Sequence, residues 1–139
     1  MLTYLFMKTS KAMKGRLDKE LKTIGTTSAQ FAVMNQIDFM DNKALAFEIA
    51  QVLGSDRPTI SAIIQRLYTS DIIYKIDNII DRRSSYICLT QKGITMLKDL
   101  RVIADKISVE IFQDFSDSEQ LQLATHLTTI CTRLEGKDD

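Results

Sequence analysis

The chain has 139 residues, of which 45% are hydrophobic and 26% charged, with five glycines and one proline. This length fits one domain of ordinary globular composition and excludes collagen-like, low-complexity and largely disordered chains. Basic and acidic residues are equal at 18 each, so no overall basic excess indicates a nucleic-acid partner. The charge is uneven, however: residues 1–24 hold six basic and two acidic side chains, residues 54–92 six and four, and residues 93–139 five and nine.

Cysteine, histidine and hydropathy patterns exclude several classes. Cys88 and Cys131 are too few for a disulfide scaffold and match no zinc spacing, and His126 cannot form a metal site alone. The apolar stretch from Met1 to Met7 is too short for a signal-peptide core, and no run approaches the ~18 apolar residues of a membrane span. We therefore expect a cytoplasmic protein with no membrane partner, metal or cofactor.

The first third of the chain contains three stretches with helical periodicity. Apolar residues at a spacing near 3.6 predict an amphipathic helix over 2–24. Thr27, with Gln30 three positions on, predicts a capping box at the start of a second helix. The polar pair at 41–42 breaks that helix and can start a third, short helix, which Gly54 ends.

The rest of the chain alternates helix, hairpin and helix. Residues 58–69 form another helical stretch, with a proline in its first turn. The β-rich runs at 72–76 and 86–89 flank a polar stretch, which predicts a hairpin with a long tip. Thr90 can cap a long helix. Ser116, with Glu119 three positions on, begins a second capping box at the start of the last helix.

The segment from Leu45 to Leu67 has the spacing of a helix-turn-helix. Gly54 allows the turn, and Ile60 and Ile63 fill the wedge between the two helices. An arginine can bond guanine bidentately and a glutamine can bond adenine, so the polar face of the second helix suits a major groove. The expected DNA contacts on it are Arg57, Thr59, Ser61, Ala62, Gln65 and Arg66. The alternative is an ordinary αα-hairpin that uses small residues for packing.

The hairpin that follows strengthens the DNA-binding interpretation. From residue 56 to residue 93 the chain resembles the multiple-antibiotic-resistance regulator (MarR) family of winged helix-turn-helix transcription factors, with no insertion or deletion. The residues that carry the resemblance are Asp56, Thr59, Ile60, Ser61 and Leu67, then Ile72 and Ile73, then Asp81-Arg82-Arg83 and Leu89-Thr90-Gln91-Lys92-Gly93.

The resemblance implies roles for the hairpin, or wing. It implies that Asp81 and Arg83 hold the wing, that an arginine reaches the minor groove, and that Asp56 ties the wing to the recognition helix. An arginine pair on an exposed hairpin suits a narrow, electronegative minor groove. Whether Arg82 or Arg83 enters it stays open, and Lys75 is a further phosphate contact. The alternative is a solvated turn with weak surface ion pairs.

Three positions depart from the family pattern. Asp71 stands where the family usually has glycine, and aspartate tolerates the left-handed conformation with little strain. Ile79 and Ile80 stand near the wing tip, where polar or turn-forming residues are usual. Because of these isoleucines, the resemblance does not fix how the wing meets the DNA.

The predicted fold is mainly α with a small β-hairpin wing: one domain over 1–139, with a DNA-binding lobe at 25–90. The helices of 1–24 and 91–139 carry more apolar surface than such a lobe can cover. The resemblance implies that they are dimerisation helices, which place two lobes on successive major grooves of a pseudo-palindrome. The alternative is a bundle within one chain.

A small-molecule effector is also expected from the resemblance. Family members often bind small aromatic or phenolic compounds between the dimer helices and the DNA-binding lobe. The residues of this chain that could line such a crevice are Tyr4, Phe6, Lys11, Met13, Arg16, Phe31, Met34 and Phe39. The alternative is that the methionines and aromatic residues belong to the ordinary core.

The sequence therefore predicts a DNA-binding transcriptional regulator, a repressor that acts as a homodimer on double-stranded DNA and leaves it when an effector binds. The alternative is a winged protein-interaction or anti-regulator module with little DNA affinity, which the neutral charge and the apolar wing tip would suit. An enzyme is not expected, because the chain has no nucleophile set and no phosphate-binding glycine loop.

Overall fold

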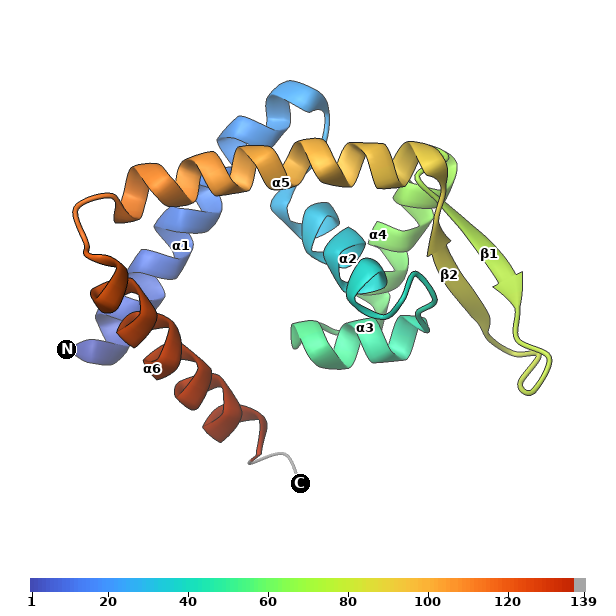
Figure 1. Ribbon diagram of the computed structural model, residues 1–139. Coiled ribbons are helices and arrows are strands. Elements are labelled where there is room, and N and C mark those ends of the chain that lie inside the picture. Colours follow the sequence, from blue (N-terminus) through green and yellow to red (C-terminus); the bar gives the residue numbers. More distant parts are fainter. Residues whose placement is uncertain (137–139) are drawn as a thin grey trace. The chain divides into compact units, whose positions relative to one another are not determined.

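The computed structural model describes residues 1–136, which form six α-helices and one β-hairpin (Figure 1). The elements in chain order are α1 (Leu2–Leu21), η1 (Lys22–Ile24), α2 (Ser28–Phe39), α3 (Ala46–Leu53), α4 (Arg57–Thr69), β1 (Ile73–Asp77), β2 (Ser85–Leu89), α5 (Gln91–Phe112) and α6 (Asp117–Glu135). The predicted fold class, mainly α with a hairpin wing, is confirmed. None of the helices within residues 1–136 is both long and apolar enough to span a bilayer.

The chain divides into two compact units, Met1–Ala104 and a second one that begins at Asp105. The first contains α1 to β2 and most of α5, and the second contains the end of α5 and α6. The winged lobe (residues 25–90) lies within the first unit. That the whole chain behaves as one domain stays a prediction.

Two side chains, those of Thr27 and Asp18, accept hydrogen bonds from the first amides of α2. The Thr27 hydroxyl accepts a hydrogen bond from the Gln30 amide at 3.1 Å, as predicted. The reciprocal half of the predicted capping box is wrong, because the Gln30 side chain accepts instead from the Thr26 hydroxyl at 2.8 Å. The Asp18 carboxylate of α1 accepts from the Ser28 amide at 2.7 Å, which ties α1 to α2.

The turn after α2 differs from the sequence expectation. Asp41 and Asn42 have left-handed φ values of 56° and 57°, so they form a turn and do not start a helix. Ala44 then pairs with Ile87 through two backbone hydrogen bonds of 3.0 and 2.8 Å, which adds a short third edge to the hairpin. The extended backbone this pairing requires delays the third helix to Ala46.

The hairpin is short and regular. β1 and β2 pair antiparallel from Ile73 with Leu89 to Asp77 with Ser85, one residue beyond the predicted strands at the tip. Asp71 adopts a φ of 61° in the tight turn before β1, the left-handed conformation expected of it. The Asn42 side chain bonds both the amide and the carbonyl of Leu89, at 2.6 and 3.4 Å, which fixes β2 against the turn after α2.

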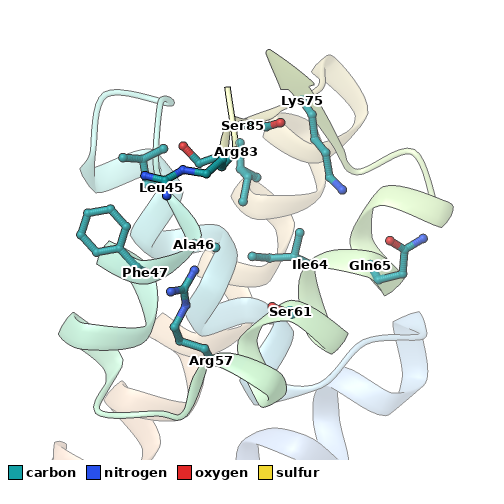
Figure 2. Close-up of a pocket in the computed structure, with 12 residues that line it drawn as sticks. Leu45, Ala46, Phe47, Arg57, Ser61, Ile64, Gln65, Lys75, Arg83 and Ser85 are labelled. Carbon is teal, nitrogen blue, oxygen red and sulfur yellow. The ribbon is translucent and has the colours of Figure 1, made fainter. Parts of the chain in front are cut away.

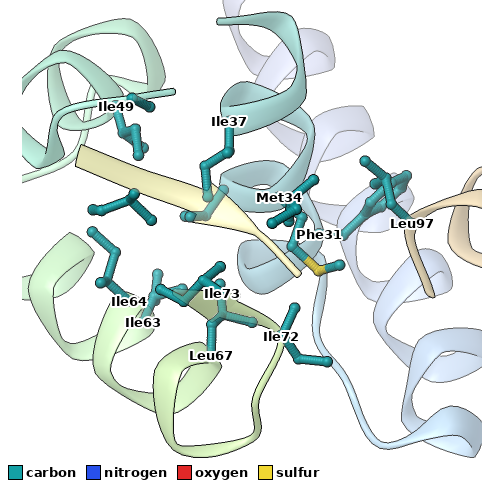
Figure 3. Close-up of a cluster of buried hydrophobic side chains, with 14 of the residues drawn as sticks. Phe31, Met34, Ile37, Ile49, Ile63, Ile64, Leu67, Ile72, Ile73 and Leu97 are labelled. Atoms are coloured by element: carbon teal, nitrogen blue, oxygen red, sulfur yellow. The ribbon is translucent and has the colours of Figure 1, made fainter. Parts of the chain in front are cut away.

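The hydrophobic core lies in the winged lobe and joins α2, α3, α4, the hairpin and the first turns of α5 (Figure 3). Its fully buried members include Met34, Ile37 and Ile49, with Ile73 from β1 and Leu100 from α5. A buried isoleucine or leucine contributes roughly 1.5–3 kcal/mol of transfer free energy. This packing fixes the orientation of α4 relative to the hairpin.

The entry into α5 depends on a close backbone approach. Thr90 caps the helix, because its hydroxyl accepts from the Gly93 amide at 3.0 Å and donates to the Asp71 carbonyl at 2.7 Å. A Cβ atom at Gly93 would lie 2.2 Å from the Ile72 carbonyl oxygen. Only glycine therefore fits this position.

In the second unit, the turn between α5 and α6 is stabilised by a capping box at the start of α6. The Ser116 hydroxyl accepts from the Glu119 amide at 3.1 Å, and the Glu119 carboxylate accepts from the Ser116 amide at 3.0 Å, which confirms the predicted capping box. The Ser116 amide, followed by the Ser116 side chain, holds the pKa of Glu119 below its usual value. The Gln120 amide donates to the carbonyls of Phe112 and Phe115, so the end of α5 and the start of α6 form one local structure.

Candidate nucleic-acid interface

A hollow of about 300 Å³ opens between α3, α4 and the hairpin. Arg57 and Ser61 of α4 lie on one side of it, and Arg83 and Ser85 of the wing lie on the other (Figure 2). The lining residues are Leu45, Ala46, Phe47, Arg57, Ser61, Ile64, Gln65, Lys75, Arg83, Ser84, Ser85 and Ile87. Five of the nine expected DNA contacts, from α4 and from the wing, therefore line this one hollow.

The polar face of α4 follows from helical spacing. Ile60, Ile63, Ile64 and Leu67 are buried in the core, which leaves the other side of the helix in water. Arg57, Ser61 and Gln65 stand four residues apart, so they form one row along that exposed side. All three line the hollow, whereas Ala62 is exposed outside it.

The role expected for Asp56 stays a prediction, because its carboxylate has another partner in this structure. Its carboxylate accepts from the Thr59 amide and from the Thr59 hydroxyl, both at 2.8 Å, so it is the N-cap of α4 and does not pair with a wing arginine. The Thr59 amide, followed by the Thr59 hydroxyl, lowers the pKa of Asp56 below its usual value. Both residues are exposed, and the Thr59 hydroxyl proton is already committed to the cap.

The loop of the wing is built around Asn78 and Asp81. The Asn78 side chain is buried, accepts from the amides of Ile80 and Asp81 at 3.1 and 3.3 Å, and donates to the Ser84 hydroxyl at 3.2 Å. Asp81 accepts from the Arg83 guanidinium, with an Nε to Oδ1 distance of 3.1 Å. A residue that sequence reasoning missed, Asn78, therefore holds the loop that presents Arg83.

The ion pair with Asp81 orients the Arg83 side chain, which stays exposed. The Arg83 side chain is 92% exposed, and a second contact joins its Nη2 to Asp81 Oδ2 at 3.4 Å. The guanidinium, followed by the Arg83 amide, holds the pKa of Asp81 below its usual value. Arg82 is exposed on the same loop but does not line the hollow.

The remaining cations of the surface have different surroundings. The Lys75 ammonium lies 4.8 Å from the centre of the Tyr68 ring and lines the hollow from β1. Arg66 lines a separate shallow depression with Gln65 and Thr69, at the C-terminal end of α4. The Lys43 ammonium lies 4.3 Å from the Tyr86 ring, beside the extra hairpin edge.

Sequence reasoning also missed the contribution of α3 and of the wing serines. Leu45, Ala46 and Phe47 line the hollow because the extended pairing of Ala44 with β2 brings the start of α3 to it. Ser84 and Ser85 line it from the wing. The two serines that directly follow Arg83 could have indicated the wing side of the hollow. The pairing of Ala44 with β2 has no sequence pattern that would predict it.

The expected effector residues fall into two different environments. Phe31 and Met34 are buried in the core, in agreement with the alternative interpretation. Tyr4, Lys11 and Met13 are exposed on α1, and Arg16 is half-buried and pairs with Glu20 at 2.7 Å. A different hollow, of about 730 Å³, is mostly apolar. It is lined by Ile24, Gln91, Lys92, Thr95, Met96, Asp99, Val102 and Ile103.

The electrostatics of the first hollow suit a polyanion. Among its lining residues are three cations, Arg57, Lys75 and Arg83, and no carboxylate. Its serines and Gln65 add neutral hydrogen-bonding groups. A concave surface with these groups can hold a run of phosphates, since each cation replaces a counterion.

No family model matches the sequence. Among solved structures, MepR of S. aureus in complex with DNA is 25% identical, with a TM-score of 0.85 over 96% of this chain and 98% of MepR. The transcriptional regulator PA3341 is also 25% identical, with a TM-score of 0.86 over 98% of this chain and 99% of that one. A mutant of MarR from E. coli in complex with operator DNA has the same fold, with 20% identity and a TM-score of 0.83 over 93% and 92% of the two chains.

Proposed function

This chain is a winged helix-turn-helix protein of the MarR family, and we propose that it binds double-stranded DNA as a transcriptional regulator. The chain is not an enzyme, as the sequence predicts. The observation that carries the proposal is the hollow that Arg57, Lys75 and Arg83 line with no carboxylate among them. MepR and MarR, whose folds it shares, have been solved with DNA.

In this proposal one phosphodiester strand passes through the hollow. The α4 helix then lies in the major groove on one side of that strand, and the wing lies in the minor groove on the other side. Arg57 and Gln65 face base edges, where arginine suits guanine and glutamine suits adenine. Lys75, Ser61 and Ser84 contact the phosphodiester strand itself. The side chain of Ala62 is small, so the backbone of α4 can come close to a thymine methyl group.

Binding should depend steeply on salt. The chain has no net charge, so attraction to DNA comes only from local cations. Each phosphate that a lysine or arginine neutralises adds ~0.9 to the slope of log affinity against log salt. Arg66 and Arg82, which lie outside the hollow, are proposed as additional phosphate contacts.

We propose that the functional form is a homodimer. The α1 helix exposes Leu2, Leu5 and Phe6, and α6 exposes Leu121 and Leu134. Apolar surface of this extent is rare on monomeric proteins and typical of an interface. A second copy of the chain would cover it and would place two winged lobes ~34–36 Å apart, on successive major grooves of a pseudo-palindrome.

We also propose regulation by a small aromatic or phenolic molecule, which rests on the apolar hollow beside α5 alone. The apolar hollow of about 730 Å³ beside Ile24 and α5 is large enough for such a ligand. Lys92 in its lining donates to the Ser70 carbonyl at 2.9 Å, at the end of α4. A ligand that engages Lys92 would compete with this contact to the recognition helix, which is the route we propose for release of a repressor from its operator.

The test is selection of bound duplexes from a random pool, followed by titration of the enriched duplex at several salt concentrations. Arg83→Ala should weaken binding by about tenfold or more and reduce the salt slope by about 1 for each bound lobe. Lys98→Ala is the matched control, because Lys98 is an exposed cation of α5 that does not line the hollow. Absence of any salt-sensitive binding by the unmodified protein would overturn the proposal and favour a protein-interaction module.

A further inference from the structure

The tip of the wing exposes two adjacent large apolar side chains. Ile79 is 85% exposed and Ile80 is 94% exposed, at the end of a hairpin that extends away from the helices of the lobe (Figure 1). Isoleucine is among the residues most often buried in proteins. A pair of them at a projecting tip leaves apolar surface that a binding partner can cover.

The tip has a defined shape. The Asn78 side chain accepts from the Ile80 amide at 3.1 Å and is itself buried. The Ser84 amide donates to the Asp81 carbonyl at 3.2 Å, which closes the loop from its other side. These hydrogen bonds fix the backbone of the tip before any partner binds, so little backbone conformational entropy is lost on contact.

The surroundings of the tip identify the chemistry of the partner. Arg82 and Arg83 follow the isoleucines within three residues, and both are exposed. Arg83 and Ser84 also form the wing side of the hollow, so the tip lies beyond the strand that this hollow would hold. Asp81 lies between the isoleucines and the arginines and pairs with Arg83 at 3.1 Å. An apolar tip beside these two arginines fits an anionic partner with apolar surface inside it, and the stacked bases of a minor groove provide both.

We infer that Ile79 and Ile80 form a wedge that enters the minor groove and partly unstacks one base step, which bends the duplex. This inference rests on the proposed DNA-binding function. Isoleucine is one of the side chains that proteins insert between base steps from the minor groove. Pyrimidine–purine steps unstack most easily, so the wedge adds a preference for a TA or CA step that no hydrogen bond reads.

The experiment uses the full-length protein and the duplex enriched by selection, with 2-aminopurine in place of one adenine at a time. The fluorescence of 2-aminopurine rises when its base is unstacked. The unmodified protein should raise it at one step in each wing-contacted segment, whereas the double variant Ile79→Ser, Ile80→Ser should leave it at the level of the free duplex. Affinity should fall by less than about tenfold, because the apolar contact is offset by the cost of unstacking.

Ile76→Ser is the matched control, since Ile76 is a half-exposed isoleucine of β1 outside the tip. It should keep the fluorescence signal. If the unmodified protein binds the duplex with no unstacking at any position, or if the double variant unstacks it equally, the wedge is overturned while the proposed DNA binding stands. If no duplex is bound at all, both proposals fall.

Discussion

The winged lobe and the terminal helices use apolar residues in opposite ways. In the lobe, Met34, Ile37, Ile49 and Ile60 are buried almost completely. In α6 every residue is exposed, and so is every residue of α1 as far as Gly15. Helical periodicity alone did not distinguish the two kinds of helix, because both have an apolar stripe.

The difference separates two sources of stability. The lobe has its own core and positions α4 and the wing within one chain. The apolar stripes of α1 and α6 gain their stabilisation only when another surface covers them. Substitutions in the lobe should therefore act on folding at any protein concentration, whereas substitutions in α6 should act on association.

The largest contrast is expected between Ile37 and Leu121. Ile37 is fully buried in α2, so Ile37→Ala should lower the free energy of unfolding by about 3–4 kcal/mol through lost transfer free energy and a cavity. Leu121 is 70% exposed on α6, so Leu121→Ala should change the unfolding of the free chain by less than about 0.5 kcal/mol. Urea denaturation at two protein concentrations measures both effects.

In the dimer, Leu121→Ala should lower the apparent stability only at the higher concentration, where the unmodified chain is associated. A loss for Leu121→Ala that is as large as that for Ile37→Ala and independent of concentration would contradict the distinction between lobe and terminal helices.

A second contrast comes from two glycines. Gly93→Ala should destabilise the protein by about 3 kcal/mol, because the new Cβ would lie 2.2 Å from a backbone oxygen of Ile72 that cannot move without shifting β1. Gly15→Ala meets no atom within 4 Å and lies inside α1, so it should stabilise the helix by up to ~1 kcal/mol. Thermal unfolding of the two variants should shift in opposite directions, and shifts of the same sign would break the comparison.

Much of the fold could be predicted because its signals are local. The caps at Thr27 and Ser116 and the turn at Asp71 each depend on the chemistry of a few consecutive residues, and the structure has all three. The pairing of Ala44 with Ile87 could not be predicted, since it joins residues 43 positions apart through backbone groups that every residue has. The late start of α3 follows from that pairing.

The candidate site was predicted unevenly for the same reason. The row of Arg57, Ser61 and Gln65 follows from helical spacing, so it could be named from the sequence. The cap that Asp56 forms with Thr59, three residues away on the same helix, was not predicted, and an N-cap there competes with any distant arginine. Asn78 gave no signal, because a buried asparagine that organises a loop looks like any other loop asparagine.

A third prediction concerns the exposed part of the lobe, where the effect should be on specificity and not on folding. Asp81→Asn removes the charge that directs Arg83, while it also removes a carboxylate near the phosphates. Affinity for a scrambled duplex should therefore stay equal or rise, whereas the ratio between enriched and scrambled duplex should fall about fivefold, as expected for one exposed ion pair.

Titration of both duplexes at one salt concentration measures this ratio. Asp77→Asn, at the end of β1 and also exposed, is the control and should leave the ratio unchanged. An unchanged ratio for Asp81→Asn would mean that Arg83 needs no orientation by Asp81.

The smallest effect should appear where α1 joins the lobe, and it should depend on pH. The Ser28 amide donates to the Asp18 carboxylate at 2.7 Å, and this hydrogen bond lowers the pKa of Asp18 below its usual value. A group with a lower pKa in the folded state stabilises the fold above its unfolded pKa, and this contribution is lost as the pH falls through the folded pKa. Asp18→Ala should therefore cost at most about 1 kcal/mol at pH 7 and less with each step below about pH 4.

The free energy of unfolding of Asp18→Ala and of the unmodified protein, measured from pH 7 down to pH 3, tests this. The two curves should converge at the acid end, whereas Asp99→Ala, on the exposed side of α5, should follow the unmodified protein throughout. Parallel curves for Asp18→Ala would show that its carboxylate contributes by packing and not by charge. The junction between α1 and the lobe would then depend on burial, as the core of the lobe does.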